Sequence, residues 1–66
     1  MDVTVNGVAT EIDEDATVAE LVRSKVDGHR RVAVARNGTV VPRGNWATTR
    51  LRAGDSIEVL AAVAGG

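Results

Sequence analysis

Residues 3–12 alternate apolar and polar side chains around an Asn-Gly pair, a pattern that predicts a β-hairpin. Both central residues of a two-residue hairpin turn need positive φ, which Asn and Gly tolerate. Such a turn places Val5 opposite Val8 and Val3 opposite Thr10. Paired residues share a face of the sheet, so one side of this hairpin is expected to be apolar. That side comprises Met1, Val3, Val5, Val8 and Ile12.

A second hairpin is predicted over residues 32–41, where valines flank another Asn-Gly pair. Pro42 ends its pairing, because proline has no N–H to donate to a sheet. Residues 43–51 show no clear period and are expected to be irregular with one helical turn, and 52–55 predict a tight turn. Residues 56–63 alternate again and predict the last strand. Its expected core side carries Ile57, Val59, Ala61 and Val63, and its other side carries Leu60 and Ala62.

Residues 17–26 have the three- and four-residue spacing of an amphipathic helix. The apolar stripe comprises Val18, Leu21, Val22 and Val26. Thr17 and Glu20 have the spacing of a capping box, in which each side chain satisfies the other's backbone N–H. Gly28 is expected to end the helix in a left-handed conformation. One helix would then cover one face of a sheet.

The order of strand, strand, helix, strand, strand, strand indicates an α+β fold. The connection through the helix is long enough to cross over, so a mixed sheet of five strands is expected. This is the element order of the β-grasp, or ubiquitin-like, fold. The 66 residues show no repeat and no shift of composition, so we expect one domain over residues 1–66. Residues 63–66, which end in Gly-Gly, are expected to form a flexible tail.

The composition excludes several kinds of chemistry. The chain has no cysteine, which excludes disulfides, thiolate metal sites and cysteine nucleophiles. The one histidine, His29, has no His or Cys partner, so a solvated role is favoured over catalysis and no metal site is expected. The acidic run at 13–15 lacks the spacing of a calcium loop. Without a glycine-rich phosphate loop either, we expect no bound cofactor and no enzymatic activity of the chain alone.

The charge and aromatic content bear on partners. A net charge of -1 and a single aromatic residue, Trp46, argue against nucleic acid. The longest apolar run, at 59–64, is too short to cross a membrane, so we expect a cytoplasmic protein that is a monomer when free. Trp46 is expected to pack against the core rather than contact a partner. Arginines gather in the second half and predict either a solvated surface or a docking patch for an acidic partner. They are Arg30, Arg31, Arg36, Arg43, Arg50 and Arg52.

The remaining candidate for chemistry is the tail, Ala64-Gly65-Gly66. A carboxylate reacts with nucleophiles at neutral pH only after activation, and adenylylation by ATP would convert it to a mixed anhydride. Gly65 and Gly66 have no Cβ, so they fit a narrow channel into a partner's site, where the anhydride is kept from water. Leu60 and Ala62 lie beside the tail on the open face, where an exposed apolar patch indicates partner docking.

Several motifs together resemble the ThiS family of sulfur carriers in thiamine biosynthesis, over the whole chain. They are VNG at 5–7, ATVAELV at 16–22, VAVARNGTVVPRGNWA at 32–47 and GDSIEVLAAVAGG at 54–66. The most family-specific is VPR followed three residues later by Trp46. The GD turn and the terminal AGG are shared with other β-grasp sulfur carriers. The motifs therefore predict both the fold and a reactive C-terminus.

The resemblance implies a mechanism centred on Gly66. A ThiF-like adenylyltransferase would adenylylate the Gly66 carboxylate with ATP and magnesium, while Ala64, Gly65 and Gly66 occupy its active site. A sulfur donor system fed by cysteine would then displace AMP and leave a thiocarboxylate. A ThiG-like thiazole synthase would accept that sulfur into the thiazole ring. ATP and magnesium would belong to the partner and not to this chain.

Other functions stay open on the sequence alone. The chain could carry sulfur for molybdopterin or cysteine synthesis instead, although the molybdopterin relative is usually longer and lacks the VPR…W stretch. A ubiquitin-like modifier that forms isopeptide bonds is a second alternative, against which the small size counts. A third is a β-grasp interaction module with an inert tail.

Overall fold

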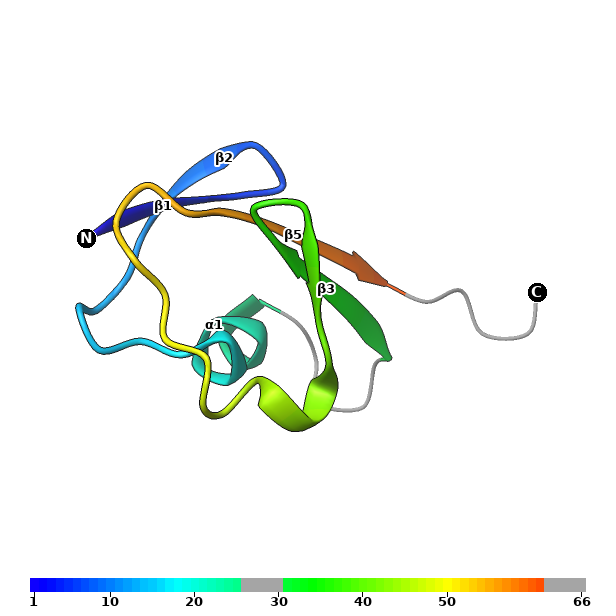
Figure 1. The fold of residues 1–66 in the computed structure, drawn as a ribbon. Helices are drawn as coiled ribbons and strands as arrows, with labels where there is room; N and C mark the ends of the chain where they lie inside the picture. The colour runs from blue at the N-terminus through cyan, green and yellow to red at the C-terminus, as the bar shows by residue number, and fades with distance from the viewer. Residues whose placement is uncertain (26–30, 62–66) are drawn as a thin grey trace.

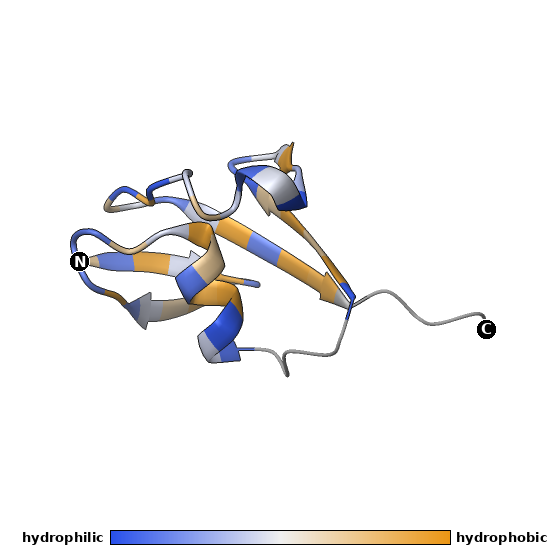
Figure 2. Cartoon of the chain, turned by 90° about the horizontal axis from the view of Figure 1, so that it is seen from below, coloured by the Kyte–Doolittle hydropathy of each residue, from blue (hydrophilic) through white to orange (hydrophobic). Residues whose placement is uncertain are grey.

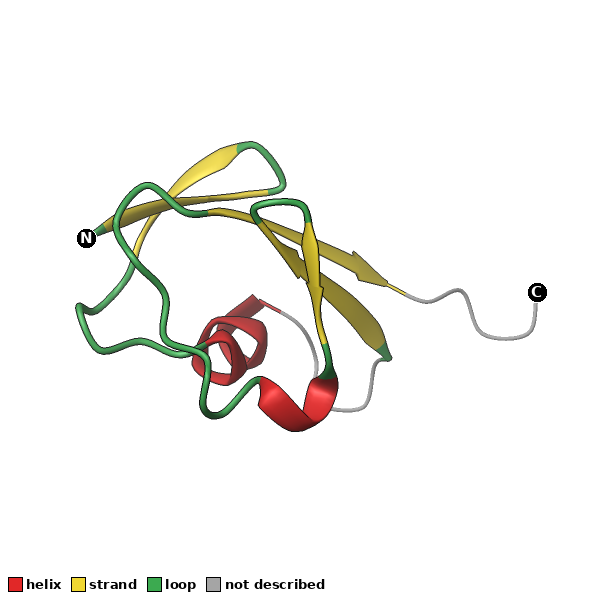
Figure 3. Ribbon diagram, in the orientation of Figure 1, coloured by secondary structure: helices red, strands yellow, loops and turns green. Residues whose placement is uncertain are grey.

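The computed structural model describes residues 1–25 and 31–61 and shows one helix against one face of a five-stranded sheet (Figure 1; Figure 3). The elements are β1 (Asp2–Val5), β2 (Val8–Glu11), α1 (Val18–Lys25), β3 (Val32–Arg36), β4 (Thr39–Val41), the 3₁₀ turn η1 (Arg43–Asn45) and β5 (Ser56–Ala61). The strand order is β2-β1-β5-β3-β4. β1 and β5 are parallel and all other neighbours are antiparallel, which confirms the expected mixed sheet.

Both Asn-Gly pairs form the predicted hairpin turns. Asn6 and Gly7 have φ of 51° and 82°, and the second pair has 50° and 84°, as a type I′ turn requires. In the first hairpin Val5 lies opposite Val8, as expected. Val8 is nevertheless 65% exposed, because β2 is an edge strand and its turn end lies away from α1 (Figure 1).

α1 begins after the predicted cap residue, Thr17, but one of the two hydrogen bonds of the predicted capping box differs. The Glu20 N–H donates to Thr17 Oγ1 at 3.3 Å, as predicted. The Glu20 carboxylate accepts from the Thr17 hydroxyl, also at 3.3 Å, and not from its backbone N–H. The N–H groups of Val18 and Ala19 donate to backbone carbonyls of the loop before β5, at 2.9 and 3.1 Å. That loop therefore satisfies the start of the helix, while the predicted stop at Gly28 lies outside the described residues.

The core lies between α1 and the sheet and is aliphatic except for Trp46. Figure 2 shows apolar positions recurring along α1 and along the strands. The buried cluster comprises Val3, Val5, Val18, Leu21, Val22, Val34, Trp46, Leu51, Ile57 and Val59. Ile57, in the central strand β5, is completely buried. Most of these residues are those that alternation and helical spacing predicted, which explains why the sequence specifies this α+β fold. No described helix is long and apolar enough to cross a membrane.

Candidate functional site

The described part of the candidate site is β5, the strand that precedes the terminal residues. The tail and docking residues Ala62, Ala64, Gly65 and Gly66 lie outside the described residues, as does His29. β5 is the central strand, with β1 on one side and β3 on the other. The geometry of the site is therefore set by what holds β5 and by the surface around its end.

The sheet face opposite α1 carries an apolar area next to the end of β5. We call it the open-face patch, and its members are Ala33, Ala35, Val40 and Leu60. Leu60 lies opposite Ala33 in the β5–β3 pairing, and Ala35 lies opposite Val40 in the β3–β4 pairing, so the four residues adjoin one another. Leu60 is 62% exposed and Val40 is 67% exposed. The predicted position of Leu60 on the open face is thus confirmed.

Alternation along the strands separates the patch from the core. Val34 and Val59, which neighbour patch residues in the chain, are paired with each other and buried. Glu58 is exposed on the patch side, opposite Ala35, and adds one negative charge at its border. An apolar surface with a charged border is a form that protein interfaces take.

At the start of β5, a buried carboxylate ties the sheet to its loops. Asp55 Oδ2 accepts hydrogen bonds from Arg36 Nε at 2.9 Å and from the Arg52 backbone N–H at 2.8 Å. Asp55 Oδ1 accepts from Asn37 Nδ2 at 3.0 Å. Burial by itself raises the pKa of Asp55, but the hydrogen bonds from Arg52, Asn37 and Arg36 outweigh it, so the pKa lies below its ordinary value. Asp55 therefore stays ionised at neutral pH.

The ion pair with Asp55 gives one arginine of the second half of the chain a structural role. Arg36 is half-buried and bonded to Asp55, so it serves the fold. The other described arginines of the second half are exposed. They are Arg31, Arg43, Arg50 and Arg52. The alternative of a solvated surface or a docking patch stays open for these four.

Two asparagine side chains hold β5 from opposite sides. The Ser56 N–H donates to Asn37 Oδ1 at 2.9 Å, and the Asn37 N–H donates to the Ser56 carbonyl at 2.8 Å. The Val59 N–H donates to Asn6 Oδ1 at 2.8 Å, and Asn6 Nδ2 donates to the Val59 carbonyl at 3.1 Å. The sequence pattern predicted both asparagines only as turn residues and did not indicate these bonds. The available signal was that both turns use Asn where Gly or Asp would also serve.

The VPR…W stretch forms a packed corner below β4. Trp46 is buried, as predicted, and its Nε1 donates to the Val41 carbonyl at 2.8 Å. The Arg43 guanidinium lies 5.3 Å from the centre of the indole ring, within range of a cation–π contact. Because Val41 is the chain neighbour of Val40, this corner supports the edge strand that carries one side of the open-face patch.

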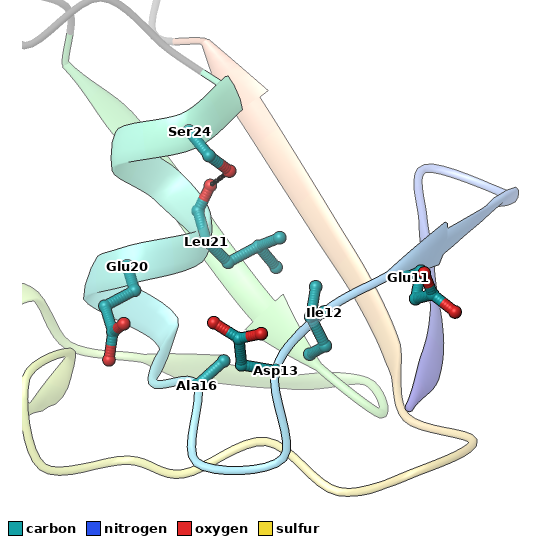
Figure 4. Close-up of a pocket in the computed structure, with 7 residues that line it drawn as sticks. All are labelled: Glu11, Ile12, Asp13, Ala16, Glu20, Leu21 and Ser24. Carbon is teal, nitrogen blue, oxygen red and sulfur yellow. Dashed lines mark hydrogen bonds between the residues drawn. The ribbon is translucent and has the colours of Figure 1, made fainter.

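A hollow of about 260 Å³ lies between α1 and the segment after β2 (Figure 4). It is lined by Glu11, Ile12, Asp13, Ala16, Glu20, Leu21 and Ser24. The Ser24 hydroxyl donates to the Leu21 carbonyl at 2.8 Å, so it is not paired with a base. Within residues 1–25 and 31–61, no three His, Cys, Asp or Glu side chains are grouped to hold a metal ion. Ser24 is therefore not a candidate nucleophile in this hollow.

The helix on one face of a mixed sheet with parallel β1 and β5 defines the class of protein, a β-grasp or ubiquitin-like domain. The sequence model of the ThiS family matches residues 3–66. The chain belongs to the ThiS family.

Solved structures agree with this assignment. The crystal structure of the thiamine biosynthesis protein ThiS from Geobacter metallireducens is 36% identical, with a TM-score of 0.83 and complete coverage of both chains. The NMR solution structure of a thiamine biosynthesis protein from the same organism is also 36% identical, with a TM-score of 0.78, covering 100% of this chain and 88% of that one. No curated protein matches the chain.

Proposed function

We propose that this chain is a sulfur carrier of thiamine biosynthesis. The observation that carries the proposal is the ThiS family match, which runs from Val3 through the terminal Gly-Gly. Support comes from the two Geobacter metallireducens structures, which are named for thiamine biosynthesis and share the whole fold.

The reactive group in this proposal is the Gly66 carboxylate. It attacks the α-phosphorus of ATP in a ThiF-like adenylyltransferase, which supplies the magnesium, and pyrophosphate leaves. Hydrosulfide delivered by a donor system then attacks the acyl carbon of the adenylate, AMP leaves, and a thiocarboxylate remains. Sulfur is a softer nucleophile than oxygen, and the acyl link keeps it from diffusing away. A ThiG-like thiazole synthase accepts that sulfur into the thiazole ring.

The folded body delivers the tail to these enzymes. The open-face patch adjoins the end of β5, so a partner surface that covers Leu60 also reaches Ala61, the last described residue before the tail in the sequence. We place Leu60 and Ala62 in the docking surface and Ala64, Gly65 and Gly66 in the partner's active site. Glycines suit that place because they occupy little width. The chain is then a co-substrate, and the catalytic groups belong to the partners.

Intact-mass measurement tests the proposal. The chain is incubated with ATP, magnesium, a ThiF-like adenylyltransferase and a sulfide source, and a chain lacking Gly66 is treated in parallel. We expect the full chain to gain the mass difference between a sulfur and an oxygen atom, and the shortened chain to stay unchanged. No gain, with an enzyme that converts its own carrier in the same buffer, would exclude the sulfur-carrier function.

A second stage separates the pathways. A carrier for molybdopterin or cysteine synthesis would show the same gain in mass, so the thiocarboxylate form is next given to a ThiG-like thiazole synthase and its acceptor substrates. We expect the sulfur to be lost and the carboxylate form to return. Retention of the sulfur would point to another pathway, and covalent conjugates with other proteins would point to a ubiquitin-like modifier.

A further inference from the structure

The side chain of Asn6 lies where β1 ends and β5 continues. The last backbone pair of these two strands is Val5 with Ile57, while β5 runs on to Ala61. On its other side β5 stays paired with β3, with Ala61 opposite Val32. Beyond Ile57, β5 therefore has a backbone partner on the β3 side, and on the β1 side its neighbour is the Asn6 side chain.

The Asn6 amide takes the place of one more residue of β1. Its Oδ1 accepts from the Val59 N–H at 2.8 Å and its Nδ2 donates to the Val59 carbonyl at 3.1 Å, while the Asn6 backbone N–H donates to the Ile57 carbonyl at 2.8 Å. One acceptor and one donor directed at the same residue reproduce the bonds of a neighbouring strand. Asn tolerates the φ of 51° that brings the amide there.

The turn alone does not explain this contact. Asn37 occupies the same position of the second hairpin, with φ of 50°, but its amide bonds to Ser56 and Asp55 at the start of β5. Of the two asparagines, Asn6 is the one that bonds to the half of β5 that carries Val59 and Leu60, and it does so from 53 positions away in the chain. The two asparagines therefore share a turn position and a backbone conformation but bond to opposite halves of β5.

From this geometry we propose that Asn6 is a positioning residue for the reaction of the tail. The proposal rests on the sulfur-carrier function above. Asn6 keeps β5 paired on both sides as far as Val59, so the last described residues of the strand, Leu60 and Ala61, are held in place beside the rest of the open-face patch. A partner docked on that patch then receives the Gly66 carboxylate at a constant reach, which keeps its effective concentration high. Asn6 itself takes no part in the chemistry.

The test compares Asn6→Gly with Asn37→Gly. Glycine accepts positive φ, so both variants keep the turn and lose only the side-chain bonds. Asn6→Asp is a third variant that keeps the acceptor for the Val59 N–H and loses the donor. Each is measured by urea unfolding, by amide hydrogen exchange of Val59 to Ala61, and by kcat and KM for adenylylation by a ThiF-like enzyme.

We expect Asn6→Gly to speed exchange at the end of β5 by about tenfold or more, because two hydrogen bonds are lost. Its kcat/KM should fall by a similar factor, with Asn6→Asp intermediate. Asn37→Gly should leave the exchange rate at the end of β5 and kcat/KM within about twofold of the wild type. We expect this although the variant also loses the Asn37 bond to buried Asp55 and so destabilises the fold at least as much as Asn6→Gly does.

Two results would overturn the positioning role of Asn6 and leave the sulfur-carrier function standing. One is equal exchange and equal turnover in the two glycine variants, which would reduce Asn6 to general stabilisation. The other is faster exchange in Asn6→Gly with unchanged turnover, which would show that holding the end of β5 in place is irrelevant to the partner. A wild-type chain that acquires no sulfur would instead overturn the carrier function, and the positioning role with it.

Discussion

Replacing Leu60 by Asp tests the open-face patch as a docking surface. Full burial of a leucine side chain contributes about 1.5–3 kcal/mol. Leu60 is 62% exposed, so about 1–2 kcal/mol of this is left for a partner to gain by covering it. That free energy corresponds to roughly 5–30-fold in Kd. A carboxylate placed against an apolar partner surface adds a desolvation penalty, so we expect at least about tenfold weaker binding.

Val8 offers a matched control for this substitution. It is 65% exposed, nearly the same as Leu60, but it pairs with the core residue Val5 and therefore lies on the opposite face of the sheet. Val8→Asp introduces the same charge far from the patch. Titration calorimetry with a ThiF-like adenylyltransferase, in the absence of ATP, gives Kd for the wild type and both variants. Urea unfolding should show both variants within about 0.5–1 kcal/mol of the wild type, because both positions are exposed.

The outcome separates docking from general charge effects. We expect a large loss of affinity for Leu60→Asp and a change within about twofold for Val8→Asp. An unchanged Kd for Leu60→Asp would remove the patch from the interface. Equal losses for the two variants would show that the partner senses net charge and not this face of the sheet.

Three further substitutions test the supports of the site. Asp55→Asn should destabilise the fold by about 2–4 kcal/mol at pH 7 in urea unfolding, because its bonds to Arg36 and Arg52 lose their charge. The folded-state pKa of Asp55 lies below 3.8, so the stabilisation by its ionised carboxylate is complete above about pH 5 and is lost as the pH falls below 3.8. The difference in free energy of unfolding between Asp55→Asn and the wild type should therefore be smaller at pH 3 than at pH 7. Trp46→Ala should cost about 3–5 kcal/mol in thermal unfolding, since a buried indole and its bond to Val41 are lost. Thr17→Ala should cost about 1 kcal/mol, with reduced helicity by circular dichroism, because the cap of α1 is removed.

For each of these three substitutions, one result would contradict the physical reason given for its effect. If the free energies of unfolding of Asp55→Asn and the wild type differ by the same amount at pH 3 and pH 7, the ionised carboxylate does not stabilise the fold. For Trp46, Trp46→Phe keeps a ring in the core and loses the N–H, so it should be clearly milder than Trp46→Ala; equal losses would assign the whole effect to the hydrogen bond. Unchanged stability of Thr17→Ala would mean that the loop carbonyls alone cap the helix.

The sequence predicted the local structure well because local chemistry decides it. Asn-Gly pairs fixed both turns, and the pairing of Val5 with Val8 followed from the turn length alone. Alternation assigned Ile57 and Val59 to the core and Leu60 to the open face, as the structure confirms. These inferences depend only on residues that are close in the chain, where the side-chain period of a strand leaves one choice.

The remaining features depend on which segments become neighbours. Alternation assigns a residue to a face but not to a neighbouring strand, so the central parallel pair of β1 and β5 did not follow from the pattern. The exposure of Val8 reflects an edge position that only the strand order reveals. Both turns use Asn where Gly or Asp would also serve, but this signal does not say that the side chains of Asn6 and Asn37 bond to β5. Asp55 appeared only as part of a turn, and its partner Arg36 comes from another strand.

The central place of β5 also has a consequence for the rate at which the protein folds. The two hairpins are local and can form independently, but β5 joins them through contacts as distant in sequence as Asn6 and Val59, 53 positions apart. Such non-local pairing is slow, because the loop must close before the contacts stabilise it. Insertion of β5 is thus expected to limit the folding rate. A chain that has formed only its hairpins lacks a complete open-face patch, so partner enzymes would discriminate against it and act on chains that have finished folding.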